Sequence, residues 1–301
     1  MRIGLLLFFV AIASLEATAS TRVATINLKN YLVQDRRVGE RWRPEHPKPE
    51  SEKDAIRRAI AEINPDILAL QEMGPAPFLV EFQRDLKADG MDYPYAILLE
   101  AADPDRHLAV LSRIEPVEVI QHTDMDFPYQ GERIPVKRGL LEVVFPTDDS
   151  PESNWSLFVV HLKSRWSDVE ADPLSSERRT KEARAARNRI LERYPGADGL
   201  YLIAGDFNDH RDSGPLRRFL RKGDLEISRI IESYDSRGET WTFNYKRYDI
   251  YERVDFILAS PAMMPKVIGQ EGTVFDPLYI HEGTDHRPVY IDLNLQPLQP
   301  L

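Results

Sequence analysis

The sequence predicts a single domain that mixes α-helices with β-strands. Short apolar runs typical of strands alternate with amphipathic segments typical of helices, and no change of composition or flexible linker divides the chain. No segment recurs with a period of about 20 to 50 residues, which argues against a solenoid or propeller. A chain of 301 residues, 42% of them hydrophobic, is long enough to bury a sizeable core.

The first residues predict a signal peptide. Arg2 precedes an apolar run of about ten residues, too short for a bilayer span, which takes about 20. Ala17-Thr18-Ala19 offers a small-residue cleavage site, so we expect a signal peptide over 1–19 and one domain over 20–301. A buried or disordered N-terminal segment is the alternative. The chain has no Cys, which excludes disulfides, and we expect a secreted or periplasmic protein.

The first part of the domain predicts a strand, a loop, a helix and a second strand. Arg22–Leu28 alternates and is β-branched, as strands are. Gln34–Pro49 shows neither period and predicts a long exposed loop, which either overhangs a site or decorates the surface. Ser51–Ile63 carries apolar residues at helical spacing, and Asp66–Gln71 predicts a buried strand that closes on Glu72.

The rest of the chain continues this alternation. Pro173–Arg193 predicts a long basic helix whose arginines form a solvated face. A short basic helix follows the turn at Gly214 and runs to Arg221. The other expected elements are a helix over Phe78–Leu86 and strands over Tyr95–Leu99, Leu108–Ser112, Arg138–Phe145, Trp155–Val160, Leu200–Ala204, Val254–Leu258 and Pro288–Leu293.

Polar side chains follow many of these strands at the point where each strand ends. The apolar run from Leu200 leads into Gly205-Asp-Phe-Asn, so that Asp206 and Asn208 project from the strand end. Ligands of α/β sheets bind at the carboxyl ends of strands. The sequence therefore predicts a common rim made of Asn27, Glu72, His161, Asp206, Asn208, Asp255, Asp285 and His286.

These residue types suit the hydrolysis of a phosphate ester. The oxygens gain charge in the transition state, so the site needs a hard cation, hydrogen-bond donors and a base that activates water. Glu72 and Asp285 are the natural ligands for Mg²⁺ or Mn²⁺, which prefer oxygen. A zinc site is disfavoured, because the chain has no Cys and no close His pair on a predicted helix.

Histidines supply the proton chemistry of such a site. His286 suits a general base whose tautomer Asp255 fixes, and His161 suits a donor to a phosphate oxygen. Taken singly, each residue also has a structural explanation, such as a turn cap at Asn27 or an ion pair between Asp255 and Arg253. Only the combination favours an active site.

Six short motifs, taken in order, resemble the endonuclease/exonuclease/phosphatase superfamily. They are Thr-Ile-Asn27-Leu, Gln-Glu72, His161-Leu-Lys-Ser, Gly-Asp206-Phe-Asn, Val-Asp255-Phe and Gly-Thr-Asp-His286. Pancreatic-type deoxyribonucleases, apurinic-site endonucleases, inositol-polyphosphate phosphatases and neutral sphingomyelinases belong to this superfamily. Gly-Asp-Phe-Asn and the final Asp-His are specific in combination, and the motifs cover essentially the whole chain after residue 19.

The resemblance implies an α+β fold, a four-layer α/β/β/α sandwich of two packed mixed β-sheets flanked by helices. It also implies roles for the rim. Asp206 would orient or deprotonate the attacking water, and either Asp206 or His286 would take its proton. The implied catalytic residues are His161, Asp206, Asn208, Asp255 and His286, the metal-side residues are Asn27, Glu72 and Asp285, and Arg138 would reach toward phosphate.

Two positions depart from the relatives that act on abasic DNA. Lys29 stands where those members often carry a carboxylate, and His107 stands where small or amide residues are usual. These departures argue against the abasic-site activity but leave the hydrolytic residues untouched.

The charge of the chain bears on its substrate. A net charge of −10 argues against tight non-specific nucleic-acid binding but not against a local phosphate site. The leading prediction is an exported, Mg²⁺-dependent nuclease-like phosphodiesterase that works as a monomer without stable membrane association. Basic and aromatic residues would line the nucleic-acid groove: Lys163, Arg165, Trp166, Arg36, Arg37, Arg41 and Trp42.

Two alternatives stay open. A phosphatase or sphingomyelinase-like enzyme would keep the same core, although no long apolar membrane-docking hairpin is evident in the sequence. A non-catalytic binding module on the same fold would lack core residues, yet every residue sought is present.

Overall fold

The computed structural model describes residues 20–147 and 150–296, and two β-sheets form its centre. The predicted signal peptide lies outside the described residues. The larger sheet has seven strands in the order β16-β20-β21-β1-β4-β6-β5. Its strands are β1 (Thr21–Tyr31), β4 (Ile67–Met73), β5 (Tyr95–Leu99), β6 (His107–Ser112), β16 (Glu232–Tyr234), β20 (Glu271–Val274) and β21 (Val289–Leu293).

The smaller sheet has six strands in the order β15-β19-β12-β11-β10-β7. Both sheets are mixed, since β1 runs parallel to β4 and antiparallel to β21, while β11 runs parallel to β12 and antiparallel to β10. The strands of this sheet are β7 (Glu118–His122), β10 (Leu140–Thr147), β11 (Ser150–His161), β12 (Tyr201–Asp206), β15 (Arg229–Ile230) and β19 (Asp255–Ala259).

The two sheets pack face to face over one apolar core. Val23 and Val110 of the larger sheet share this core with Val143, Trp155 and Leu202 of the smaller one, and all five side chains are fully buried. Trp155 packs on Phe145 with ring centroids 5.2 Å apart. Side chains from alternate positions of each strand fill the space between the sheets, as in other sheet sandwiches.

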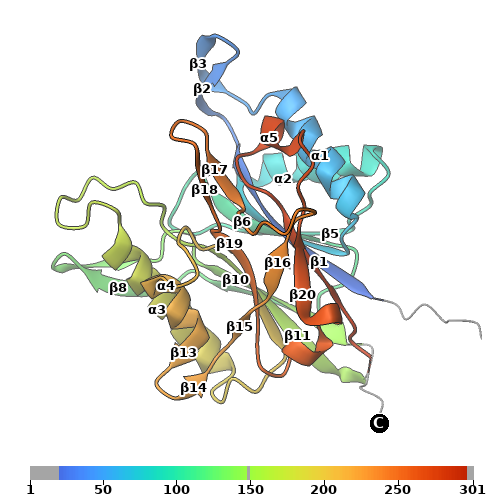
Figure 1. Ribbon diagram of the computed structural model, residues 1–301, viewed down its shortest axis with the longest axis vertical. Coiled ribbons are helices and arrows are strands. Elements are labelled where there is room, and N and C mark those ends of the chain that lie inside the picture. Colours follow the sequence, from blue (N-terminus) through green and yellow to red (C-terminus); the bar gives the residue numbers. More distant parts are fainter. Residues whose placement is uncertain (1–19, 148–149, 297–301) are drawn as a thin grey trace, which may run out of the picture.

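Helices cover the two outer faces. On the larger sheet lie α1 (Glu50–Ile63), α2 (Ala76–Ala88) and the short α5 (Ile280–Gly283), and on the smaller sheet lie α3 (Ser176–Arg193) and α4 (Gly214–Leu220) (Figure 1). Each helix layer has its own buried apolar cluster against its sheet. The predicted four-layer α/β/β/α sandwich is therefore confirmed.

The segment predicted as a long loop is instead a hairpin. Gln34–Val38 (β2) pairs with Arg41–His46 (β3) in antiparallel register, and Arg36 within it is buried. The guanidinium of Arg36 donates to the carbonyl of Asn30 in β1 and to that of His46 in β3, which ties the hairpin to β1. The prediction failed because these strands have no buried apolar face to produce a two-residue period.

Three further hairpins lie outside the two sheets. They are β8–β9 (Asp126–Tyr129, Glu132–Pro135), β13–β14 (Arg221–Lys222, Leu225–Glu226) and β17–β18 (Phe243–Tyr245, Ile250–Glu252). In Figure 1 the hairpins β2–β3 and β17–β18 project at the same upper end of the molecule. Two short 3-10 helices, Met264–Lys266 and Ile268–Gln270, precede β20.

The basic face predicted for α3 is only partly solvated. Arg179 and Arg187 are buried, and Arg179 forms an ion pair with the buried Asp209 at 2.8 Å. Its guanidinium also donates to the carbonyl of Lys163, so α3 fixes the loop that follows β11. No helix within the described residues is long and apolar enough to cross a membrane.

Candidate active site

Three polar residues of the rim lie side by side because their strands are in register. His161 ends β11 opposite Asp206 of β12, and Asp206 lies opposite Asp255 of β19. All three side chains are buried. Neighbouring residues on paired strands have Cβ atoms about 5 Å apart, so this register alone assembles an imidazole and two carboxylates.

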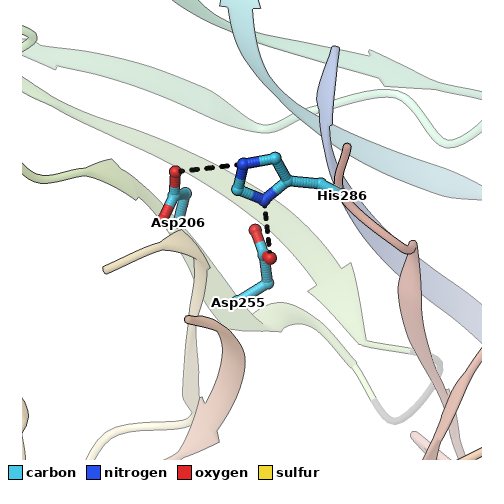
Figure 2. Close-up of side chains that lie close together, drawn as sticks. All are labelled: Asp206, Asp255 and His286. Carbon is cyan, nitrogen blue, oxygen red and sulfur yellow. Dashed lines mark hydrogen bonds and ion pairs between the residues drawn. The ribbon is translucent and has the colours of Figure 1, made fainter. Parts of the chain in front are cut away.

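The larger sheet supplies the other side of the site. Asn27, in β1, donates its Nδ2 to Asp206 Oδ2 at 3.0 Å, so an amide of one sheet holds a carboxylate of the other. His286, just before β21, donates Nδ1 to Asp255 Oδ2 at 2.8 Å. Figure 2 shows the imidazole of His286 between the two carboxylates, with its Nε2 4.0 Å from Asp206 Oδ2. The site thus lies where the two sheets meet.

A glycine allows the two central strands to approach. Gly205 has φ +142°, and a Cβ placed on it would lie 2.0 Å from the carbonyl oxygen of Val160 in β11. Only a residue without a side chain fits there. This close approach brings Asp206 level with His161.

Unusual backbone conformations surround the same place. Glu72 and Asn208 have φ of +59° and +52°, a backbone region that residues other than Gly rarely adopt. The pairing of β1 with β4 also breaks register between Asn27 and Tyr31. Such bulges re-aim side chains, and strained residues gather at functional sites. Asn208 uses its position to donate both N and Nδ2 to Asp206.

The charges of this site depend strongly on one another. Burial alone would lower the pKa of His286, but the charge of Asp255 and its hydrogen bond outweigh it and raise the pKa to about 10. Burial, followed by the charge of Asp255, raises the pKa of Asp206 to about 7, against the opposing effect of His286. The arrangement therefore favours a protonated imidazole beside a carboxyl group that can change protonation state near neutral pH.

His161 is held in the neutral form. Burial first, and then the charge of Arg138, lower the pKa of its imidazole well below the ordinary value. Its Nε2 lies 3.6 Å from Asp206 Oδ2 and 3.8 Å from Glu72 Oε1, while its Nδ1 has no hydrogen-bond partner among the described residues. His161 thus joins Glu72 to the group around Asp206.

Glu72 offers the donor that suits a hard cation. Its Oε2 accepts the backbone N–H of Asn30 at 2.8 Å, which leaves Oε1 on the side of His161. Oxygen donors from carboxylates are what Mg²⁺ and Mn²⁺ bind, often with only one or two per ion. Asp206, Asp255 and His286 also bring ligand atoms within 4.8 Å of one another, but both nitrogens of His286 already face carboxylates.

The residues present therefore fit a divalent cation at Glu72. Buried polar atoms of the site, including Nδ1 of His161 and Oδ1 of Asp255, have no hydrogen-bond partner among the described residues. Buried polar groups without partners are costly, so their concentration here indicates a place for a polar ligand.

Three predicted residues are not brought into this group. Asp285 is partly exposed, and its carboxylate lies 3.8 Å from the ammonium of Lys29. Arg138 precedes β10 and pairs with Asp103 at 3.1 Å, although its charge still acts on His161. Lys163 donates to the carbonyls of Ser164 and Trp166 in its own loop.

Other residues that position the site were not predicted. Thr284 donates its Oγ1 to the carbonyl of Asn27 at 2.8 Å and accepts the N–H of His286, and Thr242 accepts the N–H of Asp255. Arg106 donates to Asn30 Oδ1 at 2.7 Å. Thr284 stands in the Gly-Thr-Asp-His motif, which was a signal for it, whereas nothing in the sequence around Arg106 indicated its contact.

The comparisons with known proteins agree with this geometry. A family model described as endonuclease/exonuclease/phosphatase family matches residues 25–286. The chain belongs to that family. Members of the endonuclease/exonuclease/phosphatase family are metal-dependent phosphoester hydrolases, and this chain is therefore an enzyme of that type. No curated protein matches the sequence.

Solved structures share the fold of this family member. An endonuclease/exonuclease/phosphatase from Bacteroides vulgatus superposes with a TM-score of 0.62 at 16% identity, covering 92% of this chain and 99% of that one. Sphingomyelinase C from Streptomyces griseocarneus superposes with a TM-score of 0.61 at 18% identity, covering 92% of this chain and 100% of that one. A mutant beta toxin from Staphylococcus aureus with bound magnesium ions has a TM-score of 0.63 at 14% identity, covering 91% of this chain and 99% of that one. At these identities the likeness shows the fold alone.

Proposed function

We propose that this chain is an exported, Mg²⁺-dependent phosphodiesterase that cleaves nucleic acid and works as a monomer. The observation that carries the hydrolytic part is the group of Asp206, Asp255 and His286, in which a carboxylate and a protonated imidazole face each other across 4.0 Å. This separation exceeds a direct hydrogen bond, so an oxygen between them can contact both.

The roles of the residues follow from their contacts. Asp206, held by the amides of Asn27 and Asn208, takes the proton of the attacking water as the new P–O bond forms and the ester P–O bond breaks. His286, kept protonated by Asp255, donates Nε2–H toward the phosphoryl oxygens. The leaving oxygen takes a proton from solvent.

Neutral His161 and the metal side complete the proposal. Burial holds His161 uncharged, with its Nε2 next to Glu72 and Asp206. From this position it donates Nε2–H toward another phosphoryl oxygen. Glu72 would hold Mg²⁺ or Mn²⁺, which supplies positive charge for the phosphoryl oxygens when bound. The magnesium ions of the beta toxin structure support this choice of metal.

The preference for nucleic acid is supported by groups next to the site. The loop after β11 carries Lys163, Arg165 and the exposed Trp166, and its cations and indole suit phosphates and stacked bases. Export is supported by the signal-peptide pattern of residues 1–19. Expression in a bacterial host should yield a mature chain that begins at Ser20 by mass spectrometry and runs as a monomer in gel filtration.

The test of the activity is a substrate panel with the mature protein. Plasmid, single-stranded DNA, RNA, inositol phosphates and sphingomyelin vesicles are incubated with Mg²⁺ or Mn²⁺, beside the variants Asp206→Asn and Asp212→Asn. Cleavage of a nucleic acid that Asp206→Asn loses and the control Asp212→Asn retains is the expected result. Intact nucleic acids in every condition would refute the nuclease part.

A lipid head group is the second candidate, and one observation favours it. The tip and second strand of the β17–β18 hairpin expose Tyr248, Ile250 and Tyr251, with 60%, 41% and 49% of their surfaces accessible. Exposed apolar patches of this kind also occur where proteins touch membranes. Turnover of sphingomyelin without any turnover of nucleic acid would decide for this candidate.

A further inference from the structure

A pocket opens beside the active site between the loop after β11 and the β17–β18 hairpin. It has a volume of about 440 Å³, and its lining includes Arg165, Trp166, Asn208, Phe243, Tyr245 and Glu252. This volume lies within the range of small-molecule binding sites, about 300–1,000 Å³. Of the residues that line it, only Asn208 has a role in the hydrolytic site.

The pocket is continuous with the catalytic group. Asn208, which lines the pocket, donates Nδ2 to Asp206 at 3.1 Å. Phe243 pairs with His286 as an isolated bridge, and the two rings lie 4.9 Å apart between centroids. A group bonded to a phosphate at Asp206 and His286 therefore has direct access to the pocket.

Aromatic rings supply most of the recognition surface. Phe243 and Tyr245 lie two apart on β17, so they project from the same face, and their rings are within 14° of parallel. Trp166 stands in the opposite wall with 72% of its surface accessible, and Tyr245 is 42% accessible. Exposed aromatic rings on both walls of a pocket are typical of sites that stack a planar ring.

The charges of the pocket disfavour a cationic ligand. Its carboxylate, Glu252, receives Nη1 of Arg165 on both oxygens, at 2.7 and 2.9 Å. The ammonium of Lys163 already lies over the ring of Trp166, 5.5 Å from the centroid. Within the pocket, a quaternary ammonium head group would meet the guanidinium of Arg165 and no unpaired carboxylate, whereas a neutral planar ring carries no positive charge that Arg165 would repel.

We propose that this pocket binds one nucleobase of the substrate, attached through its sugar to the phosphate at Asp206 and His286. The base stacks on Trp166 and Tyr245 beside Phe243. The remaining N–H groups of Arg165, which its pair with Glu252 holds in place, donate to acceptors on the edge of the base. This proposal rests on the proposed phosphodiesterase function, because it takes the base from a nucleotide whose phosphate occupies the catalytic group.

The test measures binding without catalysis. Adenosine 5′-monophosphate, adenosine 3′-monophosphate, ribose 5-phosphate and phosphocholine are titrated into the mature protein with Mg²⁺ by calorimetry. At least one adenosine monophosphate should bind roughly 5- to 150-fold more tightly than ribose 5-phosphate, the range that stacking of one base provides. Trp166→Ala and Tyr245→Ala should each lose most of this advantage and leave the affinity for ribose 5-phosphate unchanged.

Trp42→Ala is the matched control. Trp42 is also an exposed tryptophan, 66% accessible, but it lies on β3 outside the pocket, so its removal should change neither affinity. Equal affinity for the adenosine monophosphates and ribose 5-phosphate would overturn the proposal. Tightest binding of phosphocholine would overturn it in favour of a cationic head group.

Hydrolysis is followed separately so that the two proposals fail in different ways. Bis(p-nitrophenyl) phosphate reports phosphodiester cleavage regardless of any nucleobase. Cleavage of this compound without a base-dependent gain in affinity refutes only the pocket. A base-dependent gain that Trp166→Ala removes, without cleavage of any phosphodiester, supports the pocket and refutes the proposed activity.

Discussion

Replacement of Asp255 by Asn should change the protonation of His286. The carboxylate accepts Nδ1–H of His286 at 2.8 Å, and its charge is the main cause that raises the pKa of the imidazole against the effect of burial. Asn keeps the size of the side chain and removes the charge. In the metal-free variant the pKa of His286 should fall from about 10 toward or below its ordinary value of about 6.5.

The expected size of the effect follows from this contact. A hydrogen bond to a charged partner contributes about 1.5–3 kcal/mol. If the reaction uses protonated His286, loss of that stabilisation lowers kcat at neutral pH by roughly 10- to 150-fold. The KM should change less, since the carboxylate of Asp255 contacts His286 and Asp255 does not line the pocket beside the site.

The same exchange predicts a pH dependence of stability. The pKa of His286 in the folded protein lies above its ordinary value, so the stabilisation from the pair is fully present below about pH 6.5 and is lost as the pH rises toward 10. Wild type should therefore exceed Asp255→Asn in free energy of unfolding by more at pH 6 than at pH 10. NMR titration of the His286 imidazole and urea denaturation measure both quantities. An unchanged His286 titration in the variant would refute this reasoning.

Three other substitutions have outcomes fixed by single contacts. Gly205→Ala places a methyl group 2.0 Å from the carbonyl of Val160 and should lower the free energy of unfolding by at least about 3 kcal/mol in urea denaturation. Glu72→Gln should weaken Mg²⁺ binding at least about tenfold by calorimetry, and an unchanged affinity would place the cation elsewhere. Asp209→Ala leaves buried Arg179 without its carboxylate and should lower the free energy of unfolding by about 3–5 kcal/mol in urea denaturation. Asp224→Ala, at an exposed position, should leave the free energy of unfolding almost unchanged.

Strands with a buried face could be predicted from the sequence because burial leaves a pattern. Tyr95–Leu99 was predicted with the bounds that β5 has, and β12 and β19 differ from their predictions by only one or two residues at each end. The hairpins β2–β3 and β17–β18 were missed as strands, because they pair outside the two sheets and mix exposed polar and aromatic residues. The buried Arg179 was missed for a related reason: charged residues on a helix are normally solvated unless a partner such as Asp209 lies across the fold.

The candidate site could also be predicted from the sequence only in part. Asp206 and His161 could be placed together from the sequence, since each ends a predicted strand and strand ends share an edge. The distances between the catalytic side chains could not be predicted from the sequence, because the contacts of Asn27 with Asp206 and of His286 with Asp255 cross from one sheet to the other. Such contacts depend on how the sheets pack, which no local pattern records.

Asp206 and Asp255 lie directly opposite each other on paired strands, an arrangement that like charges disfavour. Burial and this repulsion raise the pKa of Asp206 to about 7, well above its ordinary value, so the group favours the folded state below about pH 4 and loses that contribution as the pH rises through 7. Replacement by Asn should remove this dependence. We measure the free energy of unfolding by urea denaturation without metal. The difference between Asp206→Asn and wild type should shift in favour of the variant from pH 4 to pH 8, even though we expect the variant to be inactive. A difference that is constant over this range would mean that the fold holds Asp206 without strain, and that its neighbours do not poise it as a base.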